Sequence, residues 1–157
     1  MTEGFTHLDD QGRARMVDVG SKDVTQREAV AEARVSMSDE VRHRLLAGSL
    51  PKGDAFAVAR VAAIHGAKRT SDLIPLCHPL PLDSVNATLE ATDSGVLIRV
   101  TARVTARTGV EMEAMTGAAI GAITLYDMIK GLDRGAEIGP VRLISKSGGK
   151  SGDWRRE

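Results

Sequence analysis

Polar and apolar residues alternate in several stretches of the chain, which is the pattern of half-buried strands. The alternation over residues 29–37 predicts one strand. Residues 85–89 and 96–104 alternate on the two sides of a turn at residues 93–95, and this is typical of a β-hairpin. Two shorter strands are expected at residues 16–19 and 141–144.

Other stretches repeat apolar residues at helical spacing. Ser38 is suited to cap a short helix that ends at Gly48, and residues 55–68 predict a helix that buries one broad face. Residues 111–132 predict the longest helix, whose small residues permit close packing. Residues 73–79 contain two prolines, which forbid a regular helix and predict a stiff loop.

The order of these elements decides between fold classes. Strands and helices are mixed without a strict βαβ alternation, and the clearest strand pair is an antiparallel hairpin, so an α+β fold is favoured over a doubly wound sheet. We expect a ferredoxin-like sandwich, in which an antiparallel sheet packs against helices. A single domain is expected over residues 1–157, with a mobile tail over about residues 145–157, which are rich in Gly, Ser and Lys.

Composition removes several classes of function. The 21 Lys and Arg residues equal the 21 Asp and Glu residues in number, so no global field gathers nucleic acid or an anionic membrane. The few aromatic residues disfavour base-stacking platforms. The single cysteine and the lack of an apolar run of roughly 20 residues predict a soluble cytoplasmic protein without membrane contact.

Two familiar types of site are not expected. The four histidines and Cys77 lack a metal-ligand spacing, so neither a metal nor another cofactor is predicted. The tail at residues 147–151 resembles a phosphate loop, but Ile144 stands where that motif needs glycine. Lys146 and Lys150 can nevertheless close over an anionic ligand.

The proline-bounded loop carries the first candidate groups, Cys77 and His78. His78 is either a rigidly held functional side chain or a loop-capping hydrogen-bond partner, and the sequence leaves both open. For Cys77, a small buried filler is favoured over a nucleophile.

Asp127 and Lys130 lie three residues apart on the predicted long helix and therefore share a face. They form either an exposed ion pair or, because the run around them is largely apolar, a buried site. A buried lysine would have a depressed pKa that suits acid/base chemistry.

Glu111 and Glu113 begin the same helix, where they can also act simply as favourable charges against the helix dipole. Fourteen residues separate Glu113 from Asp127, which is about 21 Å at the helical rise of about 1.5 Å per residue. One helix cannot bring both carboxylates into one small pocket. If both groups serve one substrate, the pocket is shared between subunits and an oligomer is required.

Eight blocks of sequence, taken together, closely resemble the MoaC family of molybdenum cofactor biosynthesis. They are MVDV at 16–19, KGD at 52–54, AKRT at 67–70, LIPLCHP at 73–79, GVEMEA at 109–114, YDM at 126–128, GPVRL at 139–143 and SKSGGKSG at 145–152. The resemblance runs in order from about His7 to Asp153 and independently implies a ferredoxin-like subunit. It also implies a homohexamer, a trimer of dimers with active sites at subunit interfaces.

The same resemblance implies an activity, that of a lyase that makes cyclic pyranopterin monophosphate. The implied substrate is 3′,8-cyclo-7,8-dihydro-GTP, supplied by a partner radical enzyme, and pyrophosphate is released. Several proton transfers and stabilisation of phosphate charge are needed, for which Lys, His and carboxylate groups are suited.

The family pattern carries over onto individual positions of this chain. By resemblance, the residues with catalytic roles are Asp127, Lys130, Lys52 and His78. The positions that contact the substrate are Leu76, Cys77, His78, Met112 and Glu113. Asp18, Lys22, Arg27, Glu111 and Lys146 line or support the pocket, and Lys68 and Arg69 are expected to meet the triphosphate.

Two other functions compete with this one. A ferredoxin-like domain can bind a nucleotide without turning it over, and the motifs alone do not separate such a module from an enzyme. A cyclohydrolase that acts on GTP itself is the second alternative, and the absence of a zinc-binding pattern argues against it.

Overall fold

The computed structural model describes residues 7–157, and these form six strands and four helices. The strands are β1 (Thr25–Ser36), β2 (Ser84–Thr92), β3 (Gly95–Ala106), β4 (Glu137–Ile138), β5 (Arg142–Ser147) and β6 (Trp154–Arg155). The helices are α1 (Asp39–Leu46), α2 (Ala55–Lys68), α3 (Thr70–Leu73) and α4 (Glu111–Ile129).

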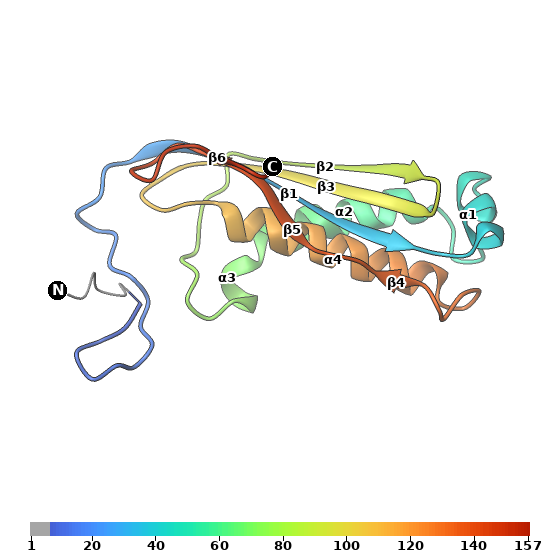
Figure 1. Ribbon diagram of the computed structural model, residues 1–157, viewed down its shortest axis with the longest axis horizontal. Coiled ribbons are helices and arrows are strands. Elements are labelled where there is room, and N and C mark those ends of the chain that lie inside the picture. Colours follow the sequence, from blue (N-terminus) through green and yellow to red (C-terminus); the bar gives the residue numbers. More distant parts are fainter. Residues whose placement is uncertain (1–6) are drawn as a thin grey trace.

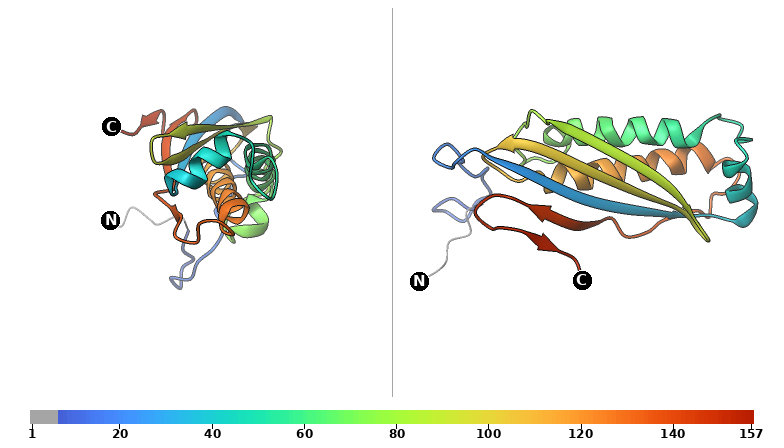
Figure 2. Two further views of the ribbon diagram at one scale, coloured as in Figure 1. Left: turned by 90° about the vertical axis from the view of Figure 1, so that its right-hand side faces the viewer. Right: turned by 90° about the horizontal axis from the view of Figure 1, so that it is seen from above.

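The strands form one antiparallel sheet in the order β2-β3-β1-β5-β6, and β4 pairs with the end of β1. The predicted hairpin is confirmed, with Thr92 paired to Gly95 across the turn. Helices α2 and α4 lie along one face of the sheet, and the sheet and these helices form two layers (Figures 1 and 2). The α+β fold expected from the sequence is therefore confirmed, as an antiparallel sheet packed against helices in the ferredoxin-like manner.

The alternation of side chains along β1 and β3 sends their small and β-branched residues toward the helices. Ala31, Ile98 and Val100 have no exposed surface, and Ala118 and Leu125 of α4 close the core from the other side. Because aromatic residues are almost absent from this core, its filling depends on the close approach of helices and sheet.

Small residues bring α2 and α4 together, as the sequence predicted. A Cβ atom added at Gly66 of α2 would lie 2.7 Å from the Cβ of Ile120. One added at Gly117 of α4 would lie 2.9 Å from the carbonyl oxygen of Ala63. The two helix backbones therefore approach more closely than any larger residue at these positions permits.

Charged side chains occupy the opposite face of the sheet. Glu32 of β1 is only 3% exposed, and its carboxylate accepts hydrogen bonds from Arg142 at 2.7 Å and Arg99 at 3.3 Å. Burial raises the pKa of Glu32, but these arginines outweigh it and hold the pKa below its usual value. Sequence reasoning missed this buried acid, because it sits at an ordinary polar position of an alternating strand.

Capping residues fix where the helices begin. The side chain of Ser38 accepts a hydrogen bond from the Val41 amide and caps α1, as predicted. Asp54 accepts from the Ala57 amide at 3.0 Å and caps α2. The second cap also fixes the position of Lys52, two residues earlier.

Several expected bounds differ from the structure. Strand β1 begins at Thr25 rather than at residue 29, and both strands of the hairpin are longer than predicted. Residues 16–19 are irregular, since no strand of the sheet pairs with them. Strand β5 continues to Ser147 rather than ending at Ile144, because residues 145–147 pair with β1. Helix α4 ends at Ile129 instead of Leu132.

Within residues 7–157, no helix is both long and apolar enough to cross a membrane.

Candidate active site

Helix α4 carries one group of candidate residues at each of its ends. Glu111, Met112 and Glu113 form its first turn, and Asp127 lies in its last turn. The helix is continuous from Glu111 to Ile129. The separation of about 21 Å inferred from the helical rise therefore applies, and the chain does not bring Glu113 and Asp127 together.

A cavity of about 420 Å³, here named the Glu113 pocket, lies beside the first turn of α4. The proline-bounded loop reaches it from the other side, so that the sequence-predicted residues meet here. Those that line it are Lys22, Leu76, Cys77, His78, Glu111, Met112 and Glu113. The substrate-contacting positions implied by the family resemblance are thus neighbours in space, although they come from two separate segments.

Glu113 is the buried acid of this pocket, with 4% of its surface exposed. Burial, with a smaller contribution from the nearby carboxylate of Glu111, raises the pKa of Glu113 to about 7. Burial and the charge of Glu113 also raise the pKa of the Cys77 thiol. Glu113 can therefore give and take a proton near neutral pH, whereas Cys77 stays a neutral thiol that is poorly suited to act as a nucleophile.

His78 is half-buried in the wall of the same pocket. Among the hydrogen bonds formed within residues 7–157, none involves its ring. The alternative role as a loop-capping partner therefore finds no support, and the imidazole remains able to meet a bound molecule.

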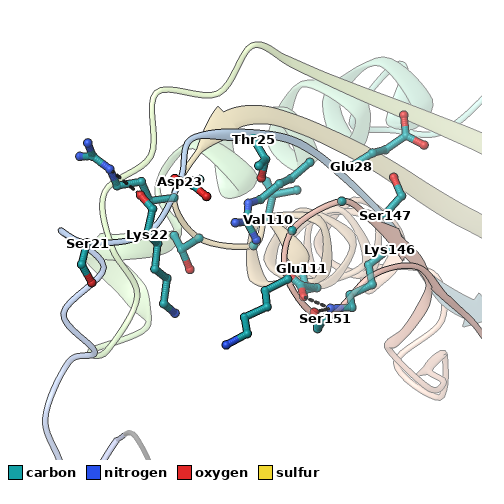
Figure 3. A pocket seen from close by; sticks show the side chains of 17 residues that line it. Ser21, Lys22, Asp23, Thr25, Glu28, Val110, Glu111, Lys146, Ser147 and Ser151 are labelled. Atoms are coloured by element: carbon teal, nitrogen blue, oxygen red, sulfur yellow. Dashed lines mark hydrogen bonds and ion pairs between the residues drawn. The ribbon is translucent and has the colours of Figure 1, made fainter.

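A larger cavity of about 1130 Å³, here named the basic cavity, adjoins this pocket and shares Lys22, Thr108, Gly109 and Glu111 with it. Figure 3 shows Lys22 on one side of the basic cavity and Lys146 with Ser151 on the other. Five basic side chains line it, namely Lys22, Arg27, Arg107, Lys146 and Lys150.

Lys146 joins the tail of the chain to the start of α4. Its ammonium group lies 3.6 Å from the Glu111 carboxylate and donates a hydrogen bond to the hydroxyl of Ser151. The pairing of β5 with β1 brings Lys146 opposite Ala29, which explains how a tail residue reaches the cavity. Lys22, Arg27, Glu111 and Lys146 thus all line the basic cavity.

The other end of α4 holds Lys52, Asp127 and Lys130, here named the Asp127 cluster. The Asp127 carboxylate lies 3.0 Å from the Lys52 ammonium and 2.8 Å from that of Lys130. Lys52 also donates to the main-chain oxygen of Asp127 at 2.7 Å. Hydrogen bonds from Lys130 and Lys52 hold the pKa of Asp127 below its usual range, so this carboxylate is ionised at neutral pH.

The hypothesis of a buried Lys130 with a depressed pKa is wrong. Half of its side chain is exposed, at 52%, and the neighbouring Asp127 raises its pKa. Of the two alternatives weighed for this pair, the exposed ion pair is confirmed. The apolar residues around Lys130 do not enclose it, because Leu125 and Ile129 face the core from another side of the helix.

Three further candidates lie outside both cavities. Asp18 accepts a hydrogen bond from the Gly20 amide at 2.8 Å and shapes the turn before Lys22. Lys68 and Arg69 are exposed at the end of α2, and Arg69 pairs with Asp72 at 3.2 Å.

Arg107 lines the basic cavity but was not among the candidate residues predicted from the sequence. It follows the last residue of β3 and precedes Gly109 at the entry to α4. In the sequence, a basic residue between a strand and a helix does not by itself indicate a binding site. The other residues that line the cavity with Arg107 come mostly from distant segments, at residues 21–28 and 146–151. In the described part of the chain, no group of three or more His, Cys, Asp and Glu side chains is arranged to hold a metal ion.

Comparison with known proteins identifies the family of the chain. The family model described as "MoaC family" matches residues 16–149. A protein named "Cyclic pyranopterin monophosphate synthase" from Roseiflexus sp. (strain RS-1) is 56% identical over 152 residues, which cover 96% of each chain. A protein of the same name from Brucella ovis is 54% identical over 156 residues, covering 98% of this chain and 94% of the relative. The chain therefore belongs to the MoaC family.

Proposed function

We propose that this chain is a cyclic pyranopterin monophosphate synthase of molybdenum cofactor biosynthesis. It converts 3′,8-cyclo-7,8-dihydro-GTP to cyclic pyranopterin monophosphate and releases pyrophosphate. The observation that carries this proposal is the identity of 54–56% to relatives of that name over nearly the whole chain. We further propose that it acts in the cytoplasm on a substrate supplied by a partner radical enzyme.

The reaction needs a phosphoryl transfer for which the Asp127 cluster is suited. A sugar hydroxyl oxygen forms a bond to the α-phosphorus, and the bond from that phosphorus to the bridging oxygen breaks. Pyrophosphate leaves with the electron pair, and the hydroxyl proton passes to a base. The ionised Asp127 and the ammonium groups of Lys52 and Lys130 supply a proton acceptor and positive charge in one cluster.

The Glu113 pocket is suited to the earlier ring chemistry. Opening a purine and reclosing it as a pterin moves protons on and off ring atoms, and a carboxyl with a pKa of about 7 can serve in both directions at neutral pH. His78 and Leu76 line the same pocket, where they can contact the base.

We propose that the complete active site is formed by two subunits within a homohexamer, a trimer of dimers. The support is the length of α4, since the Glu113 pocket and the Asp127 cluster lie about 21 Å apart on one chain. A second copy can place its Asp127 cluster against the first copy's pocket.

A conversion assay with purified protein tests the function. With 3′,8-cyclo-7,8-dihydro-GTP, we expect cyclic pyranopterin monophosphate and pyrophosphate in equal amounts. GTP alone should give no product, and a product from GTP would favour a cyclohydrolase instead. Tight binding of the cyclised nucleotide with no turnover would favour the non-catalytic binding module.

A further inference from the structure

The Asp127 cluster joins residues from two different segments of the chain. Lys130 is the first residue after α4, and Lys52 lies in the loop between α1 and α2. The turn that follows Lys130 contains Gly131 and Gly135, and glycine allows the main chain many conformations. Two lysines can meet one carboxylate only if both segments are fixed relative to the end of α4.

The carboxylate of Asp133 connects the turn after α4 to α1. Its Oδ2 accepts a hydrogen bond from the main-chain amide of Ser38 at 2.8 Å, and its Oδ1 accepts one from the amide of Gly135 at 2.9 Å. The first bond spans 95 residues of sequence and reaches the residue that caps α1. The Ser38 amide, with a smaller contribution from that of Gly135, holds the pKa of Asp133 below its usual value. Asp133 is therefore an ionised, strong acceptor at neutral pH.

The turn that Asp133 closes also fixes Lys130. The Lys130 amide donates to the carbonyl oxygen of Tyr126 at 2.8 Å, which continues the hydrogen-bond pattern of the helix. The Asp133 amide donates to the carbonyl oxygen of Ile129 at 3.0 Å. The Tyr126 hydroxyl donates to the carbonyl oxygen of Arg134 at 3.2 Å. The main chain after Lys130 is thus bonded back onto α4, and the Asp133 carboxylate ties this turn to a second element.

The same carboxylate acts on the segment of Lys52 through α1. This helix has eight residues and contacts the core through Val41 and Leu45, which are buried. The loop that follows it is anchored by buried Leu50, two residues before Lys52. Because α1 is so short, a hydrogen bond at its cap, Ser38, restricts its orientation. The position of the loop that begins where α1 ends is restricted with it.

We propose that Asp133 is a positioning residue for the Asp127 cluster. It bonds the turn after α4 to the cap of α1, and it thereby holds Lys130 and Lys52 where both meet Asp127. This inference rests on the proposed function, in which the cluster performs the phosphoryl transfer. No local pattern in the sequence reveals the role, because the partner at Ser38 is 95 residues away.

The reactivity of the lysine amines tests this positioning without turnover. Competitive labelling of the full chain with acetic anhydride, read by peptide mass spectrometry, compares each lysine with Lys68, an exposed residue at the end of α2. The neighbouring Asp127 raises the pKa of Lys130 and so keeps its amine protonated and slow to react. We expect Asp133→Ala to raise the labelling rate of Lys130 by about two- to fivefold, the range that loss of an exposed ion pair allows. Lys52 should change in the same direction.

Turnover gives a second measurement on the same variants. Asp133→Ala should lower kcat for pyrophosphate release by about 10-fold or more, since misplacing catalytic groups by about 1 Å can cost about 100-fold. KM should stay within about twofold, because the base of the nucleotide is bound at the other end of α4. Asp133→Asn should fall between Asp133→Ala and the unaltered protein. Its single amide oxygen can replace only one of the two carboxylate oxygens that accept hydrogen bonds.

Asp9→Ala is the matched control. Asp9 also accepts hydrogen bonds from two main-chain amides, those of Gln11 and Arg13, each at 2.9 Å. The N-terminal segment lies at the opposite end of the molecule from α1 (Figure 1). Loss of this carboxylate should leave kcat and the labelling of Lys130 unchanged. If Asp133→Ala fails to fold, the comparison of Asp133→Asn with Asp9→Asn carries the test.

The outcomes separate this inference from the proposed function. If the protein makes the cyclic product and Asp133→Ala is less stable but keeps its kcat, Asp133 serves only the fold and the inference is wrong. Unchanged labelling of Lys130, or a rise in KM alone, overturns it as well. If Asp133→Ala speeds the labelling of Lys130 but even the unaltered protein forms no cyclic product, the positioning is supported and the proposed function fails.

Discussion

The two ends of α4 place their carboxylates in opposite electrostatic environments. At its start, Glu113 is buried and forms no ion pair with any residue between 7 and 157, and its pKa rises to about 7. At its end, Asp127 is exposed between two lysines, and its pKa falls below the usual value. Two carboxylates on one helix thus differ in protonation at neutral pH, because one is governed by desolvation and the other by ion pairs.

This difference suits a reaction with two kinds of step. A carboxyl that changes protonation near pH 7 is suited to moving protons on a ring, and a permanently ionised carboxylate between ammonium groups is suited to phosphate chemistry. The straight helix between them keeps the two environments from disturbing each other.

Loss of the Asp127 cluster should have the largest effect. We expect Asp127→Asn and Lys52→Ala each to reduce pyrophosphate release by at least about 100-fold, the usual range for removing an acid/base group. The oligomer should remain folded, because these side chains are exposed. Asp39→Asn is a matched control, since Asp39 is an exposed helical aspartate with a basic partner, Arg42. Near-normal turnover of Asp127→Asn would remove the catalytic assignment.

A mixture of two inactive chains tests whether the two ends meet between subunits. After exchange of Glu113→Ala and Asp127→Asn subunits, about one quarter of the sites should combine an intact Glu113 with an intact Asp127 from another chain. We therefore expect recovery of up to about a quarter of the original rate. Absence of recovery, with mixed oligomers demonstrated by mass spectrometry, would mean that Glu113 and Asp127 do not serve one site shared between subunits.

The sequence predicted these two ends unequally well. The hairpin, α2 and the approach of Gly117 to α2 follow from local patterns. The family resemblance grouped two motifs that are separate in sequence, at residues 73–79 and 109–114, and both line the Glu113 pocket. The exposure of Lys130 could not be predicted in this way, because it depends on which side of α4 packs on the sheet. Arg107 was missed for a similar reason. It donates a hydrogen bond to the carbonyl oxygen of Lys22, which is 85 residues away in sequence, and no local pattern reveals this contact.

The pH dependence of stability should distinguish the buried carboxyl. The pKa of Glu113 is about 7 in the folded protein, above the ordinary value of 4.5. The contribution of Glu113 to the free energy of unfolding is therefore complete below pH 4.5 and is lost as pH rises through 7. The loss corresponds to about 3 kcal/mol of the free energy of unfolding. Glu113→Gln should remove this pH dependence. The difference in free energy of unfolding between Glu113→Gln and the unaltered protein should therefore shift in favour of the variant as pH rises from 4.5 to 8.

Urea unfolding at fixed protein concentration measures this effect. Glu90→Gln serves as the control, because Glu90 is exposed on β2 and lines neither cavity. Equal pH dependence of Glu113→Gln and the unaltered protein would mean that Glu113 is already ionised in the fold, and the contrast with Asp127 would disappear.

The smallest effect is expected from the contact that holds α4 in place between its two ends. A methyl group at Gly66 would press on Ile120 at 2.7 Å, so Gly66→Ala should lower the free energy of unfolding by about 1–3 kcal/mol. Gly131→Ala is the matched control, because its added Cβ meets nothing within 4 Å and should change stability by less than about 0.5 kcal/mol. Urea unfolding of both variants makes the comparison. If Gly66→Ala were as stable as Gly131→Ala, the α2–α4 contact would be looser than the approach of Gly66 to Ile120 indicates.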